Sequence, residues 1–255
     1  MFRPMSPAKK EYGQHFLVDP NLLDVIGRLA ELGPEDVVLE VGPGQGVLTR
    51  YLAQRVRQVH AIEIDPALEP GLRDLGGNVD VVFGDALDVD LPQDATKLVA
   101  NLPYNVATPL LVESLDGLPS IGLWCVMVQR EVADRLFARP RTKAYGAVSV
   151  LIQLAAERTG FHPVSRTVFR PQPNVDSALV AFRRTDLFPQ YAQVKKVVTA
   201  AFAHRRKTLP NSLALAGFTS REGAAEALVS IGHPEATRAE ALAPEEFVAL
   251  TEALR

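Results

Sequence analysis

Four consecutive residues, Asn101-Leu102-Pro103-Tyr104, combine a side-chain amide, a constrained backbone and an aromatic ring directly after the apolar run 97–100. Pro103 fixes its own backbone angle and biases Leu102 towards an extended conformation, so the Leu102 carbonyl stays outside any helix. This carbonyl and the Asn101 side-chain oxygen are two acceptors that can bind both hydrogens of an exocyclic amine on a nucleobase. Tyr104 offers a face on which a base can stack. Taken alone, the same residues fit an asparagine-capped turn at a strand end equally well.

Other polar residues fall at the ends of strands predicted earlier in the chain. The apolar patterns predict strands at Val37–Val41, Gln58–Ile64, Val79–Phe83 and Lys97–Ala100. Gly42, Gly44 and Gly46 follow the first strand, Glu63 closes the second, and Asp85 follows the third. Because parallel strands bring their carboxyl ends to one edge of a sheet, these groups should surround one ligand. This layout suits an adenosine-containing cofactor, although each acid taken singly is more often a solvated or helix-capping carboxylate.

The sequence of the glycine loop also counts against NAD as the cofactor. The dinucleotide fingerprint needs a third glycine at position 47, where this chain has Val47. Within the proposed cofactor site, the glycine amides can approach the ligand closely at a helix N-terminus. Glu63 can accept from a ribose hydroxyl pair, and Asp85 can accept from an adenine amine.

Strands and helices alternate through the first two thirds of the chain, which predicts an α/β fold with a doubly wound, largely parallel, Rossmann-like sheet. Further strands are predicted at 121–128, 157–164 and 178–183, and helices at 20–32, 47–56, 66–75, 107–115 and 130–139; residues 146–154 fit either a helix or a strand. Beyond residue 185 the pattern is wholly helical, with helices predicted at 191–204, 207–216, 221–231 and 244–254. We therefore predict a catalytic domain over 1–185, with a basic arm at 1–18, and a small all-helical domain over 186–255.

Composition limits the class of protein. The chain has 255 residues, of which 47% are hydrophobic, and its longest apolar run falls short of the ~20 residues that span a bilayer. Basic residues near the N-terminus without an apolar block do not resemble a secretory signal, so we expect a cytoplasmic protein without membrane contact. The single cysteine, Cys125, lies in an apolar run, and the histidines lack metal-ligand spacing. We expect no metal site.

Basic residues gather just after the predicted sheet. Residues 183–207 contain seven basic side chains against one acidic side chain, although the net charge of the whole protein is only −3. The candidates for phosphate contacts in this segment are Lys195, Lys196, Arg205, Arg206 and Lys207. A solvated helix face is the competing interpretation of such a run. A second candidate surface is the basic loop that contains Arg139, Arg141 and Lys143.

Several segments of the chain share motifs with one enzyme family. They are Gly13-Gln14-His15-Phe16-Leu17, Glu40–Gly46, Glu63-Ile64-Asp65, Gly84-Asp85-Ala86, Asn101–Asn105, Tyr145-Gly146, Phe169–Ser177 and Arg205–Leu209. Together they make the chain, from residue 12 to about 213, resemble the small-subunit ribosomal RNA adenine dimethyltransferases. The related erythromycin-resistance methylases of large-subunit RNA usually have isoleucine at position 102 and lack the Arg205–Leu209 run. Both differences favour the small-subunit group.

The resemblance implies a cofactor and a role for each matching residue. S-adenosylmethionine is expected against Gly42, Gly44, Glu63 and Asp85, with His15, Leu17 and Asn101 also lining the site. The catalytic residues implied are Asn101, Leu102, Pro103, Tyr104 and Phe169, the last completing a stack with Tyr104 around the target base. The family often has asparagine where this chain has His15. That difference leaves one hydrogen bond available from a neutral imidazole.

The implied reaction is the transfer of methyl groups to N6 of two adjacent adenosines near the 3′ end of small-subunit ribosomal RNA. We expect a monomer that acts on this RNA or on the assembling small subunit. Two other classes stay open at this point: a methyltransferase for another base or a small molecule, and an RNA-binding assembly factor without catalysis. A small-molecule enzyme would not need the basic helical domain. A purely binding protein would not need Glu63, Asp85 and Asn101 together.

Overall fold

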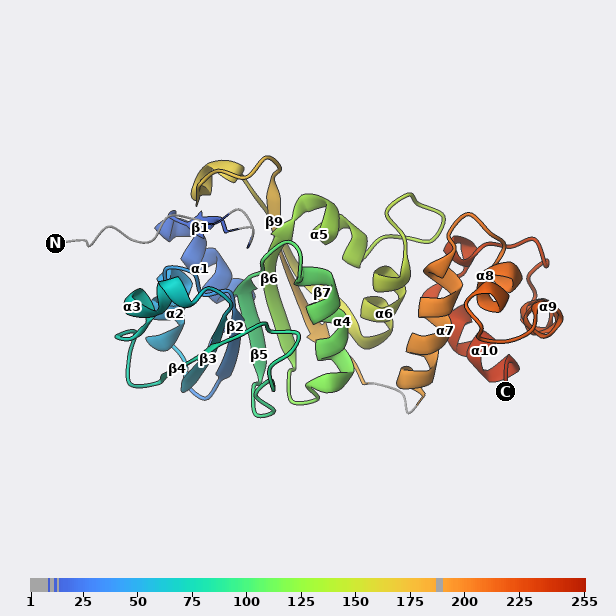
Figure 1. Cartoon of the computed structure of the whole chain (residues 1–255), viewed down its shortest axis with the longest axis horizontal. Coiled ribbons are helices and arrows are strands. Elements are labelled where there is room, and N and C mark those ends of the chain that lie inside the picture. The colour runs from blue at the N-terminus through green and yellow to red at the C-terminus, as the bar shows by residue number, and fades with distance from the viewer. Residues whose placement is uncertain (1–8, 10–11, 13, 187–189) are drawn as a thin grey trace. The chain divides into compact units, whose positions relative to one another are not determined.

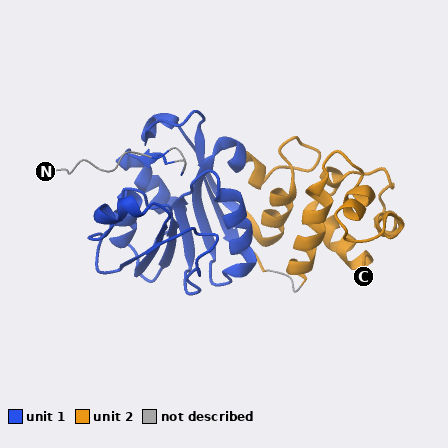
Figure 2. Ribbon diagram, viewed as in Figure 1, with its two compact units in different colours: residues 1–133, 158–184 blue, residues 134–157, 185–255 orange. Residues whose placement is uncertain are grey.

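The computed structural model describes residues 9, 12, 14–186 and 190–255. The chain divides into two compact units, shown in different colours in Figure 2. Unit 1 comprises residues 1–133 and 158–184, and unit 2 comprises residues 134–157 and 185–255. Most of the predicted basic arm 1–18, including Gly13, lies outside the described residues.

A seven-stranded sheet forms the centre of unit 1 (Figure 1). Its strands are β2 (Val37–Val41), β3 (Gln58–Glu63), β4 (Val79–Phe83), β5 (Lys97–Asn101), β6 (Leu123–Gln129), β7 (Ala156–Val164) and β9 (Ser177–Arg184), in the order β4-β3-β2-β5-β6-β9-β7. β2 pairs in parallel with β3 and β5, whereas β6 pairs in parallel with β5 and antiparallel with β9. The predicted doubly wound, largely parallel sheet is confirmed. Its strand order changes direction between β2 and β5.

Local signals set the helices that alternate with these strands. They are α1 (Pro20–Leu29), α2 (Val47–Ala53), the 3-10 helix η2 (Pro66–Leu68), α3 (Glu69–Leu72), α4 (Ala107–Gly117), α5 (Arg130–Leu136) and the 3-10 helix η3 (Arg166–Val168). Asp19 caps α1 by accepting from the Asn21 N–H at 2.9 Å, and Pro20 takes the first helical position. The single helix predicted over 66–75 is instead η2 followed by α3. Pro70 lacks an N–H and therefore starts a new helix there.

Strand β6 shows why the centre of the sheet is apolar on both sides. Leu123, Cys125 and Met127 belong to a buried cluster that also contains residues of α1 and α2. Successive side chains point to opposite faces of a strand, so Trp124 points the other way. Its indole N–H donates to the Ser114 hydroxyl of α4 at 2.9 Å. Helices therefore cover both faces, which explains an uninterrupted apolar strand rather than an alternating one.

A small two-stranded sheet was not predicted. β1 (Phe16–Leu17) pairs antiparallel with β8 (Phe169–Arg170), with Phe16 opposite Arg170 and Leu17 opposite Phe169. Each strand is only two residues long, too short for a periodic signal in the sequence. The pairing brings the start of the described chain beside the loop that precedes β9.

Unit 2 is helical, and it is larger than the predicted domain over 186–255. Its helices are the end of α5, α6 (Ala147–Ala155), α7 (Tyr191–Ala203), α8 (Leu209–Leu215), α9 (Arg221–Ser230), the 3-10 helix η4 (Ala239–Ala241) and α10 (Pro244–Ala253). Residues 134–157 join it because the Tyr145 hydroxyl donates to the Leu242 carbonyl at 2.8 Å and the Tyr191 hydroxyl donates to the Leu151 carbonyl at 3.1 Å. The later break between the two units falls after residue 184, and the predicted domain boundary stays a prediction. No helix in the described part of the chain has both the length and the apolar character needed to cross a bilayer.

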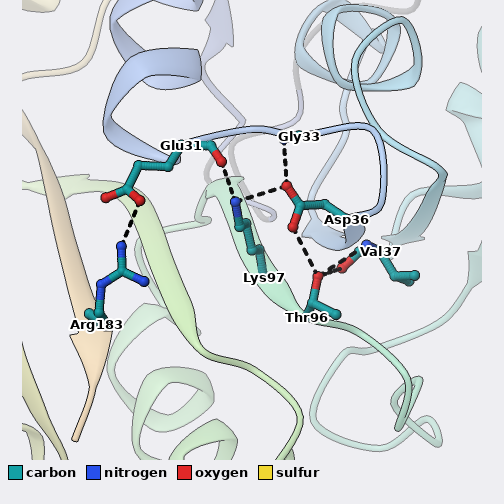
Figure 3. Close-up of polar contacts among 7 residues, drawn as sticks. All are labelled: Glu31, Gly33, Asp36, Val37, Thr96, Lys97 and Arg183. Carbon is teal, nitrogen blue, oxygen red and sulfur yellow. Dashed lines mark hydrogen bonds and ion pairs between the residues drawn. The ribbon is translucent and has the colours of Figure 1, made fainter.

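A polar network joins the segment after α1 to the amino ends of β2 and β5 (Figure 3). The Lys97 ammonium lies 2.8 Å from the Asp36 carboxylate and also donates to the Glu31 carbonyl. Asp36 accepts in addition from the Gly33 N–H at 2.6 Å and from the Thr96 hydroxyl at 3.4 Å. The side chains of Lys97 and Asp36 are only 14% and 16% exposed. Loss of one partner would leave the other charge poorly hydrated.

We expect Lys97→Met to lower the free energy of unfolding by about 1 to 3 kcal/mol, because it strands the half-buried Asp36 carboxylate. Urea denaturation measures this difference. The matched control is Arg183→Met, which removes a neighbouring ion pair with Glu31 whose side chains are 46% and 53% exposed. That change should cost at most about 1 kcal/mol, since water hydrates the exposed pair. Equal losses for the two variants would contradict the assigned role of Lys97.

Candidate functional site

A cavity opens at the carboxyl ends of β2, β3 and β5, beside the place where the strand order changes direction. Open α/β sheets bind ligands at this position. The predicted site residues that line it are His15, Leu17, Gly42, Gly44, Glu63, Asp85, Asn101, Leu102, Pro103 and Tyr104. The structure therefore brings together the glycine loop, both acids and the loop after β5, as the sequence predicted.

Two glycines allow the walls of this cavity to approach one another. Gly42 has a φ of 76°, and a side chain there would meet the Pro103 ring at 3.0 Å. Gly44 has a φ of 58°, and a side chain there would lie 2.9 Å from the Phe16 ring. Residues other than glycine rarely adopt such backbone angles. Glycine at these positions therefore lets the loop after β2 lie against both the loop after β5 and strand β1.

Glu63 links the glycine loop to the end of β3. Its side chain is 3% exposed and accepts from the Gly44 N–H at 3.0 Å and from the Asp65 N–H at 2.9 Å. Burial raises the pKa of Glu63, although the two N–H donors act in the opposite direction. The carboxylate stands where the sequence predicted a ribose contact. That contact itself stays a prediction.

Glu40 is a site residue to which the sequence analysis gave no role. It is 1% exposed, lines the cavity from β2, and its Oε2 is buried without a hydrogen-bond partner among the described residues. Burial raises the pKa of Glu40 to about 8; the nearby Thr49 hydroxyl acts in the opposite direction, and the charge of Glu63 adds to the increase. The sequence did contain a sign of this role, namely an acidic residue inside the otherwise apolar strand Val37–Val41. Carboxylates are rarely buried in such a strand without a function.

Asn101 is held in one orientation. Its side-chain NH₂ donates to the His15 carbonyl at 3.1 Å, and because a carbonyl only accepts, Oδ1 must be the opposite end of the amide. The Leu102 N–H donates to the Met127 carbonyl at 3.0 Å, which fastens the loop after β5 to the end of β6. This orientation leaves Oδ1 as the acceptor, as the predicted binding of an exocyclic amine requires.

The two predicted stacking residues differ in position. Tyr104 lines the cavity and is half-buried. Phe169 is 0% exposed, packs in the core cluster with Leu17 and Met127, and is absent from the cavity wall. The expectation that Phe169 takes the second face of a base is not supported by this position, because pairing of β8 with β1 directs its ring into the core. The ring of His15 is the one found beside Tyr104, with centroids 5.6 Å apart and planes tilted by 33°.

The remaining predicted cofactor residues are Asp85, His15 and Leu17. Asp85 is half-buried, and its carboxylate accepts from the Leu87 N–H at 2.9 Å. The His15 imidazole shares a hydrogen bond of 2.8 Å with the Pro171 carbonyl. Leu17 is 5% exposed and contributes to the core as well as to the cavity wall. All three are placed to contact a ligand, but their contacts with a cofactor stay predictions.

A polar clamp that the sequence did not reveal holds the segment before β1. Asp65 is 0% exposed, and its carboxylate lies 2.7 Å from the Lys9 ammonium. It also accepts from the Gln14 side-chain N–H at 3.1 Å. These contacts lower the pKa of Asp65 despite its burial. Gln14 and Tyr12 line the cavity, so Asp65 keeps this segment beside it.

The predicted RNA-binding residues all lie in unit 2. Lys196, Arg206 and Lys207 are exposed, and Lys195 is half-buried. Arg205 is also exposed, but its guanidinium donates to the Tyr145 carbonyl at 2.8 Å and thereby supports the loop before α6. Arg205 therefore has a structural role in addition to the predicted one. Contact of the five residues with RNA stays a prediction.

The fold and the site together define a class of protein, namely a doubly wound α/β protein with a ligand cavity at the switch point of its sheet. Among the described residues, no group of three or more His, Cys, Asp or Glu side chains is arranged to hold a metal ion.

Comparison with known proteins gives the family. The ribosomal RNA adenine dimethylase family matches residues 5–255. The chain is 49% identical to ribosomal RNA small subunit methyltransferase A of Rubrobacter xylanophilus, with 95% of this chain and 93% of the relative covered. It is 46% identical to the protein of the same name from Thermobifida fusca, with 95% and 89% covered. The chain therefore belongs to the ribosomal RNA adenine dimethylase family, and its cofactor is S-adenosylmethionine.

Solved structures agree with the fold. A dimethyladenosine transferase from Plasmodium falciparum is similar with a TM-score of 0.75 and 24% identity, covering 92% of this chain and 96% of that one. The 23S rRNA methyltransferase ErmE is similar with a TM-score of 0.66 and 31% identity, covering 94% and 99%. Both likenesses extend through the helical unit. The predicted combination of a Rossmann-like sheet with a C-terminal helical region is thus confirmed.

We expect the buried acid Glu40 to make stability depend on pH. Its pKa is about 8 in the folded protein and 4.5 as the ordinary value, so between these pH values only the unfolded chain loses the proton. Raising the pH through this window therefore favours unfolding, by up to about 1.4 kcal/mol per pH unit. Glu40→Gln removes this contribution. The free energy of unfolding of both proteins is measured by urea denaturation at pH 5, 6, 7 and 8. The stability of Glu40→Gln relative to the wild type should rise with pH. A difference that does not change with pH would show that Glu40 titrates normally.

Proposed function

We propose that this protein transfers methyl groups from S-adenosylmethionine to N6 of two adjacent adenosines near the 3′ end of small-subunit ribosomal RNA, forming N6,N6-dimethyladenosine. The observation that carries the proposal is the orientation of Asn101 in the cavity wall of a chain that belongs to the ribosomal RNA adenine dimethylase family. Because the side-chain NH₂ of Asn101 already donates to the His15 carbonyl, its Oδ1 can accept a hydrogen bond from the exocyclic amine of adenine. The names of the bacterial relatives support the small-subunit substrate.

The residues of the cavity fit the cofactor. Gly42 and Gly44 let the backbone come close to it, and Glu63 provides an acceptor for ribose hydroxyls. Asp85, at the end of β4, provides an acceptor for the adenine amine of the cofactor. S-adenosylmethionine supplies a methyl group that its positively charged sulfur already activates for transfer.

The protein's chemical task is therefore to present N6 of the target adenine in line with this methyl group. Oδ1 of Asn101 and the carbonyl of Leu102 accept the two amine hydrogens, which frees the nitrogen lone pair for attack. Tyr104 stacks on the base, an interaction worth about 1 to 3 kcal/mol. Alignment of this kind lowers a barrier by about 7 to 11 kcal/mol without a covalent intermediate. The proton released from N6 passes to water, and a second transfer repeats the step.

Unit 2 is the proposed contact for the RNA backbone. Four basic side chains would neutralise phosphates without reading bases: Lys195, Lys196, Arg206 and Lys207. Arg205 would also contact a phosphate while it supports the loop before α6. We further propose that the substrate is the assembling small subunit, that the enzyme acts as a monomer, and that it works in the cytoplasm, where its RNA substrate is found.

Methylation of a defined substrate tests the function directly. The protein is incubated with methyl-labelled S-adenosylmethionine and small ribosomal subunits that lack dimethyladenosine, and the digested RNA is separated into nucleosides. Label should appear in N6-methyladenosine and then in N6,N6-dimethyladenosine. Parallel reactions with protein-free small-subunit RNA distinguish the particle from the free RNA as substrate. Label in another nucleoside, or in large-subunit RNA alone, would contradict the proposal.

Asn101→Ala should lower the single-turnover rate by about 10² to 10³, because it removes the acceptor that acts on the reacting amine. Affinity for S-adenosylmethionine, measured by calorimetry, should change by much less than the rate. Asn105→Ala serves as the control, since Asn105 also lines the cavity but has no proposed contact with N6. Similar rates for the Asn101 variant and the control would remove Asn101 from the reaction.

Replacing both Arg206 and Lys207 by glutamine should weaken RNA binding and flatten the slope of log K against log salt by about 0.7 to 0.9 per lost phosphate contact. Binding of S-adenosylmethionine should not change. Arg205→Gln is the informative comparison, because loss of its bond to the Tyr145 carbonyl should also lower thermal stability. An unchanged salt slope in the double variant would move the RNA surface elsewhere, first to the loop 139–143.

A further inference from the structure

The hydroxyl group of Tyr104 is held by a residue from a distant part of the chain. Its oxygen lies 3.0 Å from the Ser177 hydroxyl oxygen, and the two share a hydrogen bond. Tyr104 is half-buried in the cavity wall, whereas Ser177 is 1% exposed and lies behind it at the start of β9. The bond therefore anchors the far end of the tyrosine ring, which lines the cavity.

The antiparallel direction of β9 explains why Ser177 is found there. β6 runs parallel to β5, so its last residue, Gln129, lies at the same edge of the sheet as the end of β5. In the antiparallel register Ser177 stands opposite Gln129, which puts the first residue of β9 at this edge. The Arg130 N–H donates to the Asp176 carbonyl at 2.9 Å and continues the pairing beyond the strands.

The loop that carries Tyr104 is fixed from two further directions. The Leu102 N–H donates to the Met127 carbonyl at 3.0 Å, and Asn101 is bound to the His15 carbonyl at 3.1 Å. The backbone of the loop is thus tied to β6 and its first side chain to the segment before β1. The ring of Tyr104 could still turn about its side-chain bonds. The Ser177 hydroxyl restricts rotation about the Cα–Cβ bond, since the phenol oxygen loses its buried partner when the ring swings away.

The protonation of Tyr104 is compatible with this role. Burial raises the pKa of Tyr104, although the bond to Ser177 acts in the opposite direction. The phenol therefore stays neutral across the physiological range, and both hydroxyl groups can donate and accept. A neutral ring held at a fixed position is what stacking on a nucleobase requires.

We propose that Ser177 is a positioning residue for methyl transfer: its hydroxyl holds the Tyr104 ring at one place in the cavity wall, so that the target adenine stacks with its amine aligned to Asn101. This inference rests on the proposed function and extends it to a residue that touches neither cofactor nor base. The competing role for Ser177 is purely structural, in which it satisfies a buried hydroxyl group and affects stability alone.

A double-mutant cycle tests the proposal. Ser177→Ala, Tyr104→Phe and the double variant are compared with the wild type for kcat and KM on undermethylated small subunits, and for affinity towards S-adenosylmethionine. Each single change should lower kcat roughly 3- to 10-fold, as expected for one neutral hydrogen bond. The double variant should be no slower than the slower single variant, because both changes remove the same bond. Affinity for the cofactor should stay within about twofold of the wild type.

Ser114→Ala is a matched control for loss of a buried hydroxyl. Ser114 is 0% exposed and accepts from the Trp124 indole N–H on the opposite face of the sheet, away from the cavity wall. This variant should lose stability in urea denaturation while its kcat stays that of the wild type. If Ser177→Ala fails to fold, Tyr104→Phe still tests the bond, because it deletes one oxygen and adds no bulk.

Three results would overturn the proposal. Ser177→Ala could match Ser114→Ala, with lower stability and wild-type kcat, which would establish the purely structural role. The two single changes could add in the double variant, which would show that Ser177 does not act through Tyr104. A wild-type enzyme that methylates no adenosine at all would instead refute the proposed function, and the inference would fall with it.

Discussion

The change of direction in strand order between β2 and β5 is the constraint on which the site depends. From β2 the chain proceeds through β3 and β4 on one side, and from β5 through β6 on the other. The loops after β2 and β5 therefore diverge and leave a gap at the sheet edge. Gly42 and Pro103 close the bottom of this gap, since a side chain on Gly42 would meet the proline ring at 3.0 Å. This contact sets how closely the loops after β2 and β5, which carry proposed site residues, approach one another.

Two buried acids on neighbouring strands make the same gap electrostatically unusual. Glu40 and Glu63 are 1% and 3% exposed, and the charge of Glu63 disfavours ionisation of Glu40. Burial of such groups costs stability unless a partner compensates it. Glu63 has two backbone N–H donors, whereas Oε2 of Glu40 has none. With a pKa of about 8, Glu40 is mostly protonated at neutral pH, so a second buried charge beside Glu63 is avoided.

Much of this arrangement could be predicted from the sequence because its causes are local. Uninterrupted apolar runs indicate strands buried on both faces, and Asp19-Pro20 marks the start of a helix. Once the strands are assigned, parallel connection places their carboxyl ends at one edge, so the positions of Gly42, Glu63, Asp85 and Asn101 follow. The helices over residues 191–253 could be predicted for the same reason, because the apolar spacing that indicates a helix involves only near neighbours in the chain.

The sequence by itself therefore determined the fold class and that Gly42, Glu63, Asp85 and Asn101 share one edge of the sheet. Only the tertiary structure decided which way the Asn101 amide points, that Phe169 is buried in the core, that Ser177 reaches Tyr104, and that residues 134–157 pack with the helical unit. Each of these depends on contacts between segments far apart in the chain, such as β1 with β8 and β6 with β9. Periodicity and capping report only on neighbours within a few residues, so they carry no information about such pairings.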